Sequence, residues 1–362
     1  MSLHHLLIFV FAGMAGCDKN KPPQVELPTN LNTQITVTAG LVDVLATATN
    51  ANFYTVTFYH NNDSTVVETV DGHASHTYTA SGTYTVKTCA HTTYADFISK
   101  VDQVTVTMGS SSSGAPTTGY STPLSYANYS LVWNDEFNGT ALSSDWTFDT
   151  GTGSWGWGNN ELQYYTNQNY EVGGGVLAIT AKSQAFNSSL YTSTRIKTQG
   201  IKSWKYGRID IRAALPYGQG IWPALWMLGD NISTVGWPAC GEIDIMELVG
   251  GAGANDRTVH GTAHWDDNGS HAQYGGSSVL PSGKFADEFH VFSIIWNQSS
   301  ITWLRDDVPY KTLNTTPAGL SEFQEKFFLI FNVAVGGNWP GNPDATTVFP
   351  QTMYVDYVRV FQ

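Results

Sequence analysis

The sequence predicts an all-β protein, and three observations support this fold class. Short runs in which apolar and polar residues alternate recur along the chain, for example at residues 35–38 and 207–212, and this period of two is typical of strands with one buried face. No apolar pattern of helical period extends beyond two turns. Charged residues make up only 13% of the chain, so uncharged polar residues must form much of the surface, as in exported β-rich proteins.

The charge and the cysteines exclude several classes of protein. A net charge of −13 argues against partners that are nucleic acids or anionic membrane surfaces. It also disfavours strongly anionic polysaccharides as substrates. The three cysteines lie in three different segments, so a disulfide framework is not expected.

The first 17 residues resemble a lipoprotein signal peptide. An apolar run at residues 6–15 is too short to span a bilayer, and small residues precede Cys17. The pattern departs from a bacterial lipobox signal in having two histidines and no Lys or Arg before the run, so an ordinary signal peptide with a chance Cys is the alternative. We expect a lipid anchor at Cys17 as the only membrane attachment, a tether over residues 18–31, and a bacterial lipoprotein exported to the outer membrane or cell surface.

The rest of the chain divides into two β-rich modules. Alternating runs and Asn- and Gly-containing turns over residues 32–108 predict a small immunoglobulin-like β-sandwich, and residues 76–86 resemble the end of PKD-type modules. This module is interpreted as a spacer, with a glycan-binding module as the alternative. Residues 109–125 are a linker by composition, and residues 126–362 predict a large antiparallel sandwich.

The second module contains three carboxylates in one stretch of six residues: Glu242, Asp244 and Glu247. In a regular strand the first two share a face, but Glu247 is five positions from Glu242 and would point into the core with the neighbouring isoleucines. Burial of an unpaired carboxylate is costly. A one-residue β-bulge at about 245–246 restores the parity, so the spacing predicts a bulge and three carboxylates on one face.

Like charges held on one face raise one another's pKa values, which is typical of functional sites. Glycoside hydrolysis needs one ionised and one protonated carboxyl group, roughly 5 Å apart in retaining enzymes. A calcium site is the rival interpretation, although the flanking residues are apolar and no EF-hand spacing occurs. We therefore predict Glu242, Asp244 and Glu247 as catalytic residues, with no cofactor needed for catalysis.

The motif at residues 241–247 resembles the signature of glycoside hydrolase family 16 in its β-bulge form. Supporting segments lie at 133–139, 157–165, 220–228 and 332–341, and the resemblance covers residues 126–362. It implies a β-jelly roll, Glu242 as nucleophile, Glu247 as acid/base and Asp244 in support. The laminarinase branch is the most similar and implies endo-hydrolysis of β-1,3-glucans by a monomer. The alternatives are a mixed-linkage β-1,3-1,4-glucanase or a non-catalytic surface glycan-binding lipoprotein.

Substrate-binding residues are expected where aromatic rings can stack on sugars and polar groups can bind hydroxyls. An even spacing places two tryptophans on one face, and a third lies in a Gly/Pro loop. The resemblance adds an Arg, for which a surface ion pair is the alternative role. It also adds an Asn, with the adjacent Glu161 as the alternative polar group. It adds a His near the acid/base, which could instead be a histidine of the core. The predicted set is Asn160, Arg195, Trp222, Trp226, His264 and Trp339.

The resemblance also implies a structural calcium ion remote from catalysis. Its ligands would be backbone oxygens of Glu136 and Gly175 and the carboxylate of Asp356, with water completing the shell. An ordinary Asp on the last strand is the alternative.

Overall fold

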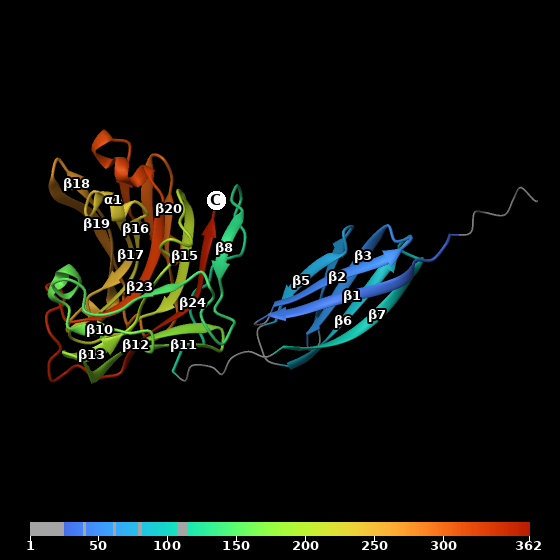
Figure 1. The fold of residues 1–362 in the computed structure, drawn as a ribbon, viewed down its shortest axis with the longest axis horizontal. Helices are drawn as coiled ribbons and strands as arrows, with labels where there is room; N and C mark the ends of the chain where they lie inside the picture. Colours follow the sequence, from blue (N-terminus) through green and yellow to red (C-terminus); the bar gives the residue numbers. More distant parts are fainter. Residues whose placement is uncertain (1–24, 39–40, 61–62, 79–81, 107–113) are drawn as a thin grey trace, which may run out of the picture. The chain divides into compact units, whose positions relative to one another are not determined.

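The computed structural model of the chain describes residues 25–38, 41–60, 63–78, 82–106 and 114–362. Nearly all regular structure in these residues is β-strand, which confirms the predicted fold class. The predicted signal peptide, the Cys17 anchor and the first part of the tether lie outside them. Among the described residues, no helix is long and apolar enough to span a bilayer. The contacts divide the chain into two compact units, coloured blue to cyan and green to red in Figure 1.

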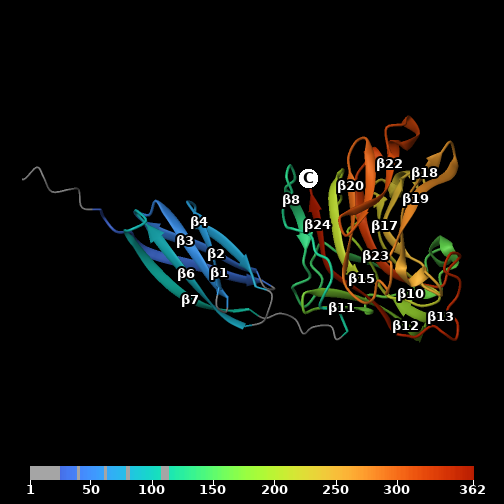
Figure 2. The ribbon, with the colours of Figure 1, turned by 180° about the vertical axis from the view of Figure 1, so that it is seen from behind.

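In its described residues, the first unit contains seven strands in two sheets. The strands are β1 (Thr29–Thr38), β2 (Leu41–Thr49), β3 (Phe53–His60), β4 (Asp63–Thr69), β5 (His73–Thr77), β6 (Gly82–His91) and β7 (Phe97–Val106). One sheet has the order β1-β2-β5 and the other β4-β3-β6-β7; β4 is labelled beside β3 in Figure 2. Buried Ala46, Tyr54 and Ala90 join the two sheets in one core, with Leu31 packed against it. The first strand begins at Thr29, before the module boundary predicted at residue 32. The earlier part of the strand contributes Leu31 to this core.

The second unit contains the remaining strands and four short helical segments. The strands are β8 (Leu131–Asp135), β9 (Thr147–Asp149), β10 (Gln163–Tyr165), β11 (Tyr170–Gly173), β12 (Val176–Phe186), β13 (Ser189–Ser193), β14 (Arg195–Lys197), β15 (Gly207–Ala214), β16 (Ile221–Gly229), β17 (Glu242–Leu248), β18 (Thr258–Asp267), β19 (Ser270–Val279), β20 (His290–Trp296), β21 (Ser300–Arg305), β22 (Val308–Asn314), β23 (Phe327–Val335) and β24 (Gln351–Phe361). The helical segments are η1 (Gly156–Asn160), α1 (Ile232–Val235), η2 (Asn255–Arg257) and η3 (Ala318–Gln324).

These strands form two sheets that pack against each other (Figure 1). The ten-stranded sheet follows the path β10-β13-β12-β24-β15-β20-β21-β22, with β11 paired to β12 and β8 to β24. The seven-stranded sheet has the order β19-β18-β17-β16-β23-β14-β9. Buried apolar side chains of both sheets fill the space between them, including Ile209 and Val355 from one and Leu225 and Phe331 from the other. The opposite face of the seven-stranded sheet is thus free to carry polar groups.

Residues 114–125, which the composition assigned to the linker, pack on the second unit. The Tyr120 hydroxyl donates to Asp307 Oδ2 (2.8 Å), and the Thr122 backbone N–H donates to the Tyr357 hydroxyl (2.8 Å). These contacts are made by hydroxyl and backbone groups, which are also abundant in free linkers. The polar composition of this segment therefore could not show that it packs on the second unit.

Candidate active site

The predicted bulge is present in β17 and places the three carboxylates on one face. Strand β17 has one extra residue relative to both neighbouring strands. Successive residues of β16 pair with Asp244 and Met246, and the register with β18 shifts between Asp244 and Glu247. The core takes Ile243, Ile245 and Met246, all nearly inaccessible to solvent. At the bulge, Trp303 of the other sheet donates its indole N–H to the backbone carbonyl of Asp244 (2.8 Å). The irregular strand therefore separates acids from apolar residues as the parity argument requires.

Glu242 and Glu247 border a cleft of about 990 Å³ on the outer face of the seven-stranded sheet, and all three acids line a smaller adjoining cavity. Its walls come from β14, β16, β17, β18 and β19, from the segment around η1 and from the loop after β23. The lining includes Trp157, Asn159, Arg195, Trp222, Trp226, Trp237, Glu242, Glu247, His260, Thr262, His264, His271, Gln273 and Trp339. Five indole rings and two glutamates in one open cleft suit a ligand with apolar faces and many hydroxyls.

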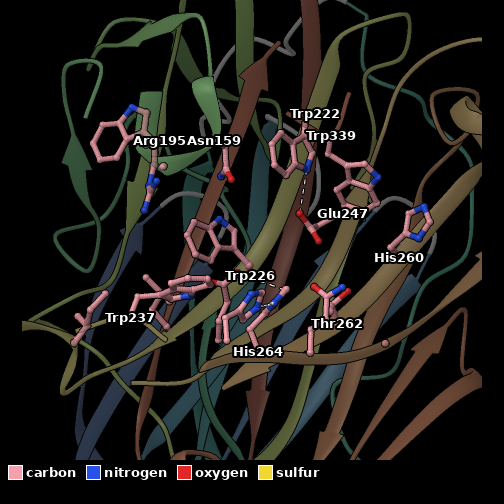
Figure 3. A pocket seen from close by; sticks show the side chains of 18 of the residues that line it. Asn159, Arg195, Trp222, Trp226, Trp237, Glu247, His260, Thr262, His264 and Trp339 are labelled. Carbon is pink, nitrogen blue, oxygen red and sulfur yellow. Dashed lines mark hydrogen bonds and ion pairs between the residues drawn. The ribbon is translucent and has the colours of Figure 1, made fainter. Parts of the chain in front are cut away.

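Glu247 lies in the tryptophan-rich part of the cleft. The indole N–H of Trp222 donates to Glu247 Oε1 at 3.0 Å (Figure 3). The Trp339 ring meets the Trp222 ring edge-to-face at 5.8 Å and the His260 ring at 5.0 Å. Glu247 itself is 8% exposed, so its carboxyl group faces the cleft from an environment that disfavours charge.

Glu242 and Asp244 lie beside titratable and polar partners. Trp237 donates its indole N–H to Glu242 Oε2 (2.9 Å). Nε2 of His264 is 3.0 Å from Asp244 Oδ2 and 3.8 Å from Glu242 Oε1, and its Nδ1 is hydrogen-bonded to His271 Nε2 (2.8 Å). The expected histidine is thus in the cleft, but its ion pairs are with the first two acids, because β18 pairs His264 with Glu242 and His260 with Glu247.

The pKa values of all three acids are raised. Burial, and then the charge of Asp244, raise the pKa of Glu242 to about 8, while His264 and the Trp237 N–H oppose the shift. Burial raises the pKa of Asp244 to about 8 against a hydrogen bond with Glu242. Burial and the charges of Asp244 and Glu242 raise the pKa of Glu247 well above its ordinary value. The site therefore retains protons near neutral pH, as general acid catalysis requires.

Arg195 lies at the β14 end of the cleft, between two tryptophans. Its guanidinium carbon is 4.7 Å from the ring centroid of Trp157 and 4.8 Å from that of Trp226. Arg195 Nε also lies 3.0 Å from Asp149 Oδ2, so the ion pair and the cleft position coexist. Trp226 in turn donates its indole N–H to Asn332 Oδ1 (2.7 Å). The ion pair with Asp149 and the two indole rings therefore hold the Arg195 guanidinium in the wall of the cleft.

The structure corrects the position of the expected Asn. Asn160 does not line the cleft; its side-chain amide donates to Asn338 Oδ1 (2.8 Å). Asn159 lines the cleft instead, and Glu161 lines the adjoining cavity. Strand parity fails here because Trp157 and Asn160 have left-handed backbone conformations (φ 55° and 56°).

Other cleft residues were missed by sequence reasoning. His260 and Thr262 share the cleft face of β18 with His264, and their even spacing from it was a usable signal. Trp237 and His271 come from a loop and from the neighbouring strand β19, and no local pattern connects them to the acids. His271 contacts the Trp237 ring at 4.7 Å.

The residues of the site could also hold a cation. Side-chain atoms of Glu242, Asp244 and His264 lie within 4.8 Å of one another, and no other such cluster occurs in the described parts of the chain. The arrangement keeps the rival metal interpretation physically possible, although all three side chains already interact with one another.

The expected calcium position fits a cation poorly. Strand β24, which carries Asp356, pairs with β8 and β12, so Glu136 and Gly175 lie near it. However, Asp356 Oδ2 accepts from Arg212 Nη1 (2.7 Å), and the Glu136 carboxylate accepts two bonds from Arg359 (2.7 and 2.8 Å). Arg212 already pairs with the Asp356 carboxylate, which is the one side-chain ligand expected, and calcium binding stays a prediction.

Comparisons with known proteins give one family match within the second unit and one that spans parts of both units. Residues 153–359 match the family described as "Glycosyl hydrolases family 16". Residues 49–243 match a second family, "Beta-glucan synthesis-associated protein SKN1/KRE6/Sbg1", a match that ends inside the acidic motif and before two of its three carboxylates.

The individual relatives agree with the first match. The chain is 44% identical to the clotting factor G alpha subunit of Tachypleus tridentatus over 65% of its own length, but spans only 34% of that protein. It is 43% identical to a beta-glucanase of Rhodothermus marinus and covers 86% of it. The laminarinase catalytic domain of Thermotoga maritima MSB8 superposes with a TM-score of 0.60 at 47% identity, covering 65% of this chain and 98% of that one. These likenesses confirm the jelly-roll fold predicted for the second unit.

Proposed function

This chain belongs to glycosyl hydrolase family 16, and we propose that it is a retaining endo-β-1,3-glucanase that cuts laminarin-like polysaccharides. The observation that carries this proposal is the bulge in β17, which presents Glu242 and Glu247 to a cleft lined with tryptophans and all three acids to the cavity that adjoins it. The similarity to a laminarinase and to a beta-glucanase supports β-1,3-glucan as the substrate.

In the first step, Glu247 would donate its proton to the glycosidic oxygen while Glu242 attacks the anomeric carbon. The glycosidic bond breaks, a new hydroxyl end leaves, and a covalent glycosyl–Glu242 ester remains. The raised pKa of Glu247 supports its role as acid. Glu242 must be ionised to attack, and the Trp237 N–H and His264 favour its ionised form.

In the second step, Glu247, now a carboxylate, would take a proton from water as the water oxygen attacks the same carbon. The ester bond to Glu242 breaks, and both carboxyl groups return to their starting states. Two displacements at one carbon give net retention. Asp244 acts between the two glutamates, since its own raised pKa and its contact with His264 let it share a proton with Glu242.

Incubation of the protein with laminarin, lichenan and agarose tests the substrate class. We expect new reducing ends from laminarin, with a range of oligosaccharides early in the reaction that indicates internal cuts. Faster release from lichenan would favour the mixed-linkage alternative. Measurable binding to laminarin without any product from a β-glucan would overturn the proposal in favour of a non-catalytic glycan-binding protein.

We also propose that the protein is a monomeric bacterial lipoprotein, anchored by lipid at Cys17 to the outer membrane or cell surface. The support is the apolar run that ends in small residues before Cys17. The PKD-like assignment of the first unit is a further proposal, supported by its two small sheets. Metabolic labelling with a fatty acid should mark the parent chain and not Cys17→Ser; equal labelling would contradict the anchor.

We also propose a structural calcium ion near Asp356, although this ion would have to compete with Arg212 for the Asp356 carboxylate. Calcium at about 100 times its Kd would stabilise the fold by roughly 2.7 kcal/mol, seen as a higher Tm than in a chelator. Asp356→Asn should abolish that response. An equal Tm in calcium and chelator for the parent chain would refute the ion.

A further inference from the structure

An aromatic cluster lies on the first unit, at one end of the sheet β4-β3-β6-β7. The Phe53 ring stacks on His91 (4.6 Å between centroids) and contacts Tyr94 (4.8 Å), while Phe97 contacts His91 (5.1 Å). Phe53 and His91 are paired residues of β3 and β6. Phe97 begins β7, and Tyr94 lies in the loop before it. The four rings, which we call the aromatic patch, thus come from three adjoining segments.

The patch is fixed in place but only half-covered. Tyr94 is 71% exposed and Phe97 41% exposed. The Tyr94 hydroxyl donates to the Glu68 carboxylate of β4 (3.0 and 3.1 Å). Its loop is closed by hydrogen bonds between Thr93 and Asp96, including Thr93 Oγ1 to Asp96 Oδ2 (2.7 Å). The Tyr94 ring is therefore held in a set position in the solvent.

The stability of the unit does not account for this arrangement. Its core lies between the two sheets and includes Tyr54 and Ala90; of the four rings of the patch, His91 is buried, whereas Tyr94 and Phe97 stay exposed. A ring that is 71% exposed removes little apolar area from water, so holding Tyr94 still contributes little to folding. Fixed, exposed aromatic rings mark surfaces that bind a partner.

The chemistry around the patch favours an uncharged carbohydrate. Tyrosine and phenylalanine rings offer flat apolar faces to the C–H faces of sugars, and a Tyr hydroxyl adds a polar contact. The charged groups beside the rings are the Glu68 and Asp96 carboxylates, which accept hydrogen bonds from sugar hydroxyls and repel anionic polymers. The Thr55 hydroxyl, bonded to His91 (2.9 Å), lies on the same face.

We propose that the aromatic patch is a second glycan site, which binds a neutral β-1,3-glucan chain outside the catalytic cleft. The identity of the glucan rests on the proposed function. Such a site would keep the chain on insoluble polysaccharide between cuts, because a second attachment raises the effective concentration of substrate at the cleft. The first unit is then a binding module rather than a spacer.

Sedimentation of the full chain with insoluble β-1,3-glucan tests the site. All proteins carry Glu242→Gln so that the polymer stays intact. The double variant Tyr94→Ala/Phe97→Ala should lower the apparent affinity about threefold to tenfold. Tyr94→Phe, which keeps the ring, should bind nearly as well as the parent. Val70→Ala is the matched control, since Val70 is 80% exposed and lies outside the patch, and it should bind as the parent does.

Activity separates this site from the catalytic one. With Glu242 intact, the double variant should lose rate on the insoluble glucan and keep the parent kcat/KM on laminaripentaose. Equal sedimentation of parent and double variant would overturn the patch whatever the activity shows. A parent chain that dimerises through the patch, with a monomeric double variant, would also overturn it. Failure of the parent on laminaripentaose would instead refute the proposed function, while the sedimentation result still decides the patch.

Discussion

The two glutamates of β17 lie in one cleft, yet their surroundings differ. Glu242 receives the Trp237 N–H and lies near His264, two partners that favour its ionised form. Glu247 lies against Trp222 in the tryptophan-rich part of the cleft, and burial, followed by the charges of the other two acids, raises its pKa well above its ordinary value. Both pKa values are thus raised, but the two side chains have different partners in the cleft, and such differences in surroundings let two carboxyl groups divide the nucleophile and acid roles.

The largest expected effect comes from removing each glutamate in turn. Glu242→Ala should lose activity on the order of 10⁴-fold or more, because no group is left to attack. Glu247→Ala should lose about 10²–10⁴-fold, the usual contribution of acid–base catalysis. Added azide then reveals the face that each glutamate occupied. Product analysis should give the α-glycosyl azide from Glu242→Ala and the β-glycosyl azide from Glu247→Ala; the reverse pairing would exchange the two roles.

The next effect concerns stability. The folded pKa of Glu242 is about 8, against roughly 4.3 in an unfolded chain. The folded state therefore holds more protons in this window, and stability falls as pH rises from about 4 through about 8. Glu242→Gln removes that loss and should stabilise the fold by about 1–3 kcal/mol at pH 8 and little at pH 4.5. Thermal unfolding at both pH values checks this, and a destabilised variant at pH 8 would contradict the raised pKa.

The smallest effect separates the two tryptophan N–H groups. Each one stabilises a carboxylate by roughly 1 kcal/mol, or somewhat under one pKa unit. Trp237→Phe should therefore raise the pKa of Glu242 and move the acid limb of the kcat/KM profile to higher pH. Trp222→Phe should raise the pKa of Glu247 and move the alkaline limb to higher pH. Phe retains a ring for stacking in both variants. If both variants shifted the same limb of the kcat/KM profile, the assignment of Glu242 as nucleophile and Glu247 as acid would be contradicted.

Much of this site could be predicted from the sequence because it lies on regular strands. The parity of Glu242, Asp244 and Glu247 required the bulge, and the even spacing of Trp222 and Trp226 placed both in the cleft. Strand geometry alternates faces whatever the surrounding fold, so local spacing is enough to assign a face there.

The remaining features depend on backbone turns and distant pairings. Asn159 replaces Asn160 in the cleft because left-handed residues interrupt the alternation. His264 contacts Glu242 and Asp244 because of a strand register that no single segment encodes. The aromatic patch needed β3, β6 and β7 to be aligned, so its exposed rings were not recognisable in sequence.

Trapping the glycosyl-enzyme tests the central claim most directly. A 2-fluoro laminarioligosaccharide with a good leaving group should inactivate the protein: the leaving group departs, and the whole fluorinated oligosaccharide stays on the enzyme because the fluorine slows the hydrolysis of the ester. Peptide mapping by mass spectrometry should then find the label on Glu242. A label on Glu247 or Asp244, or an active enzyme that hydrolyses with inversion and never accumulates the ester, would contradict the account.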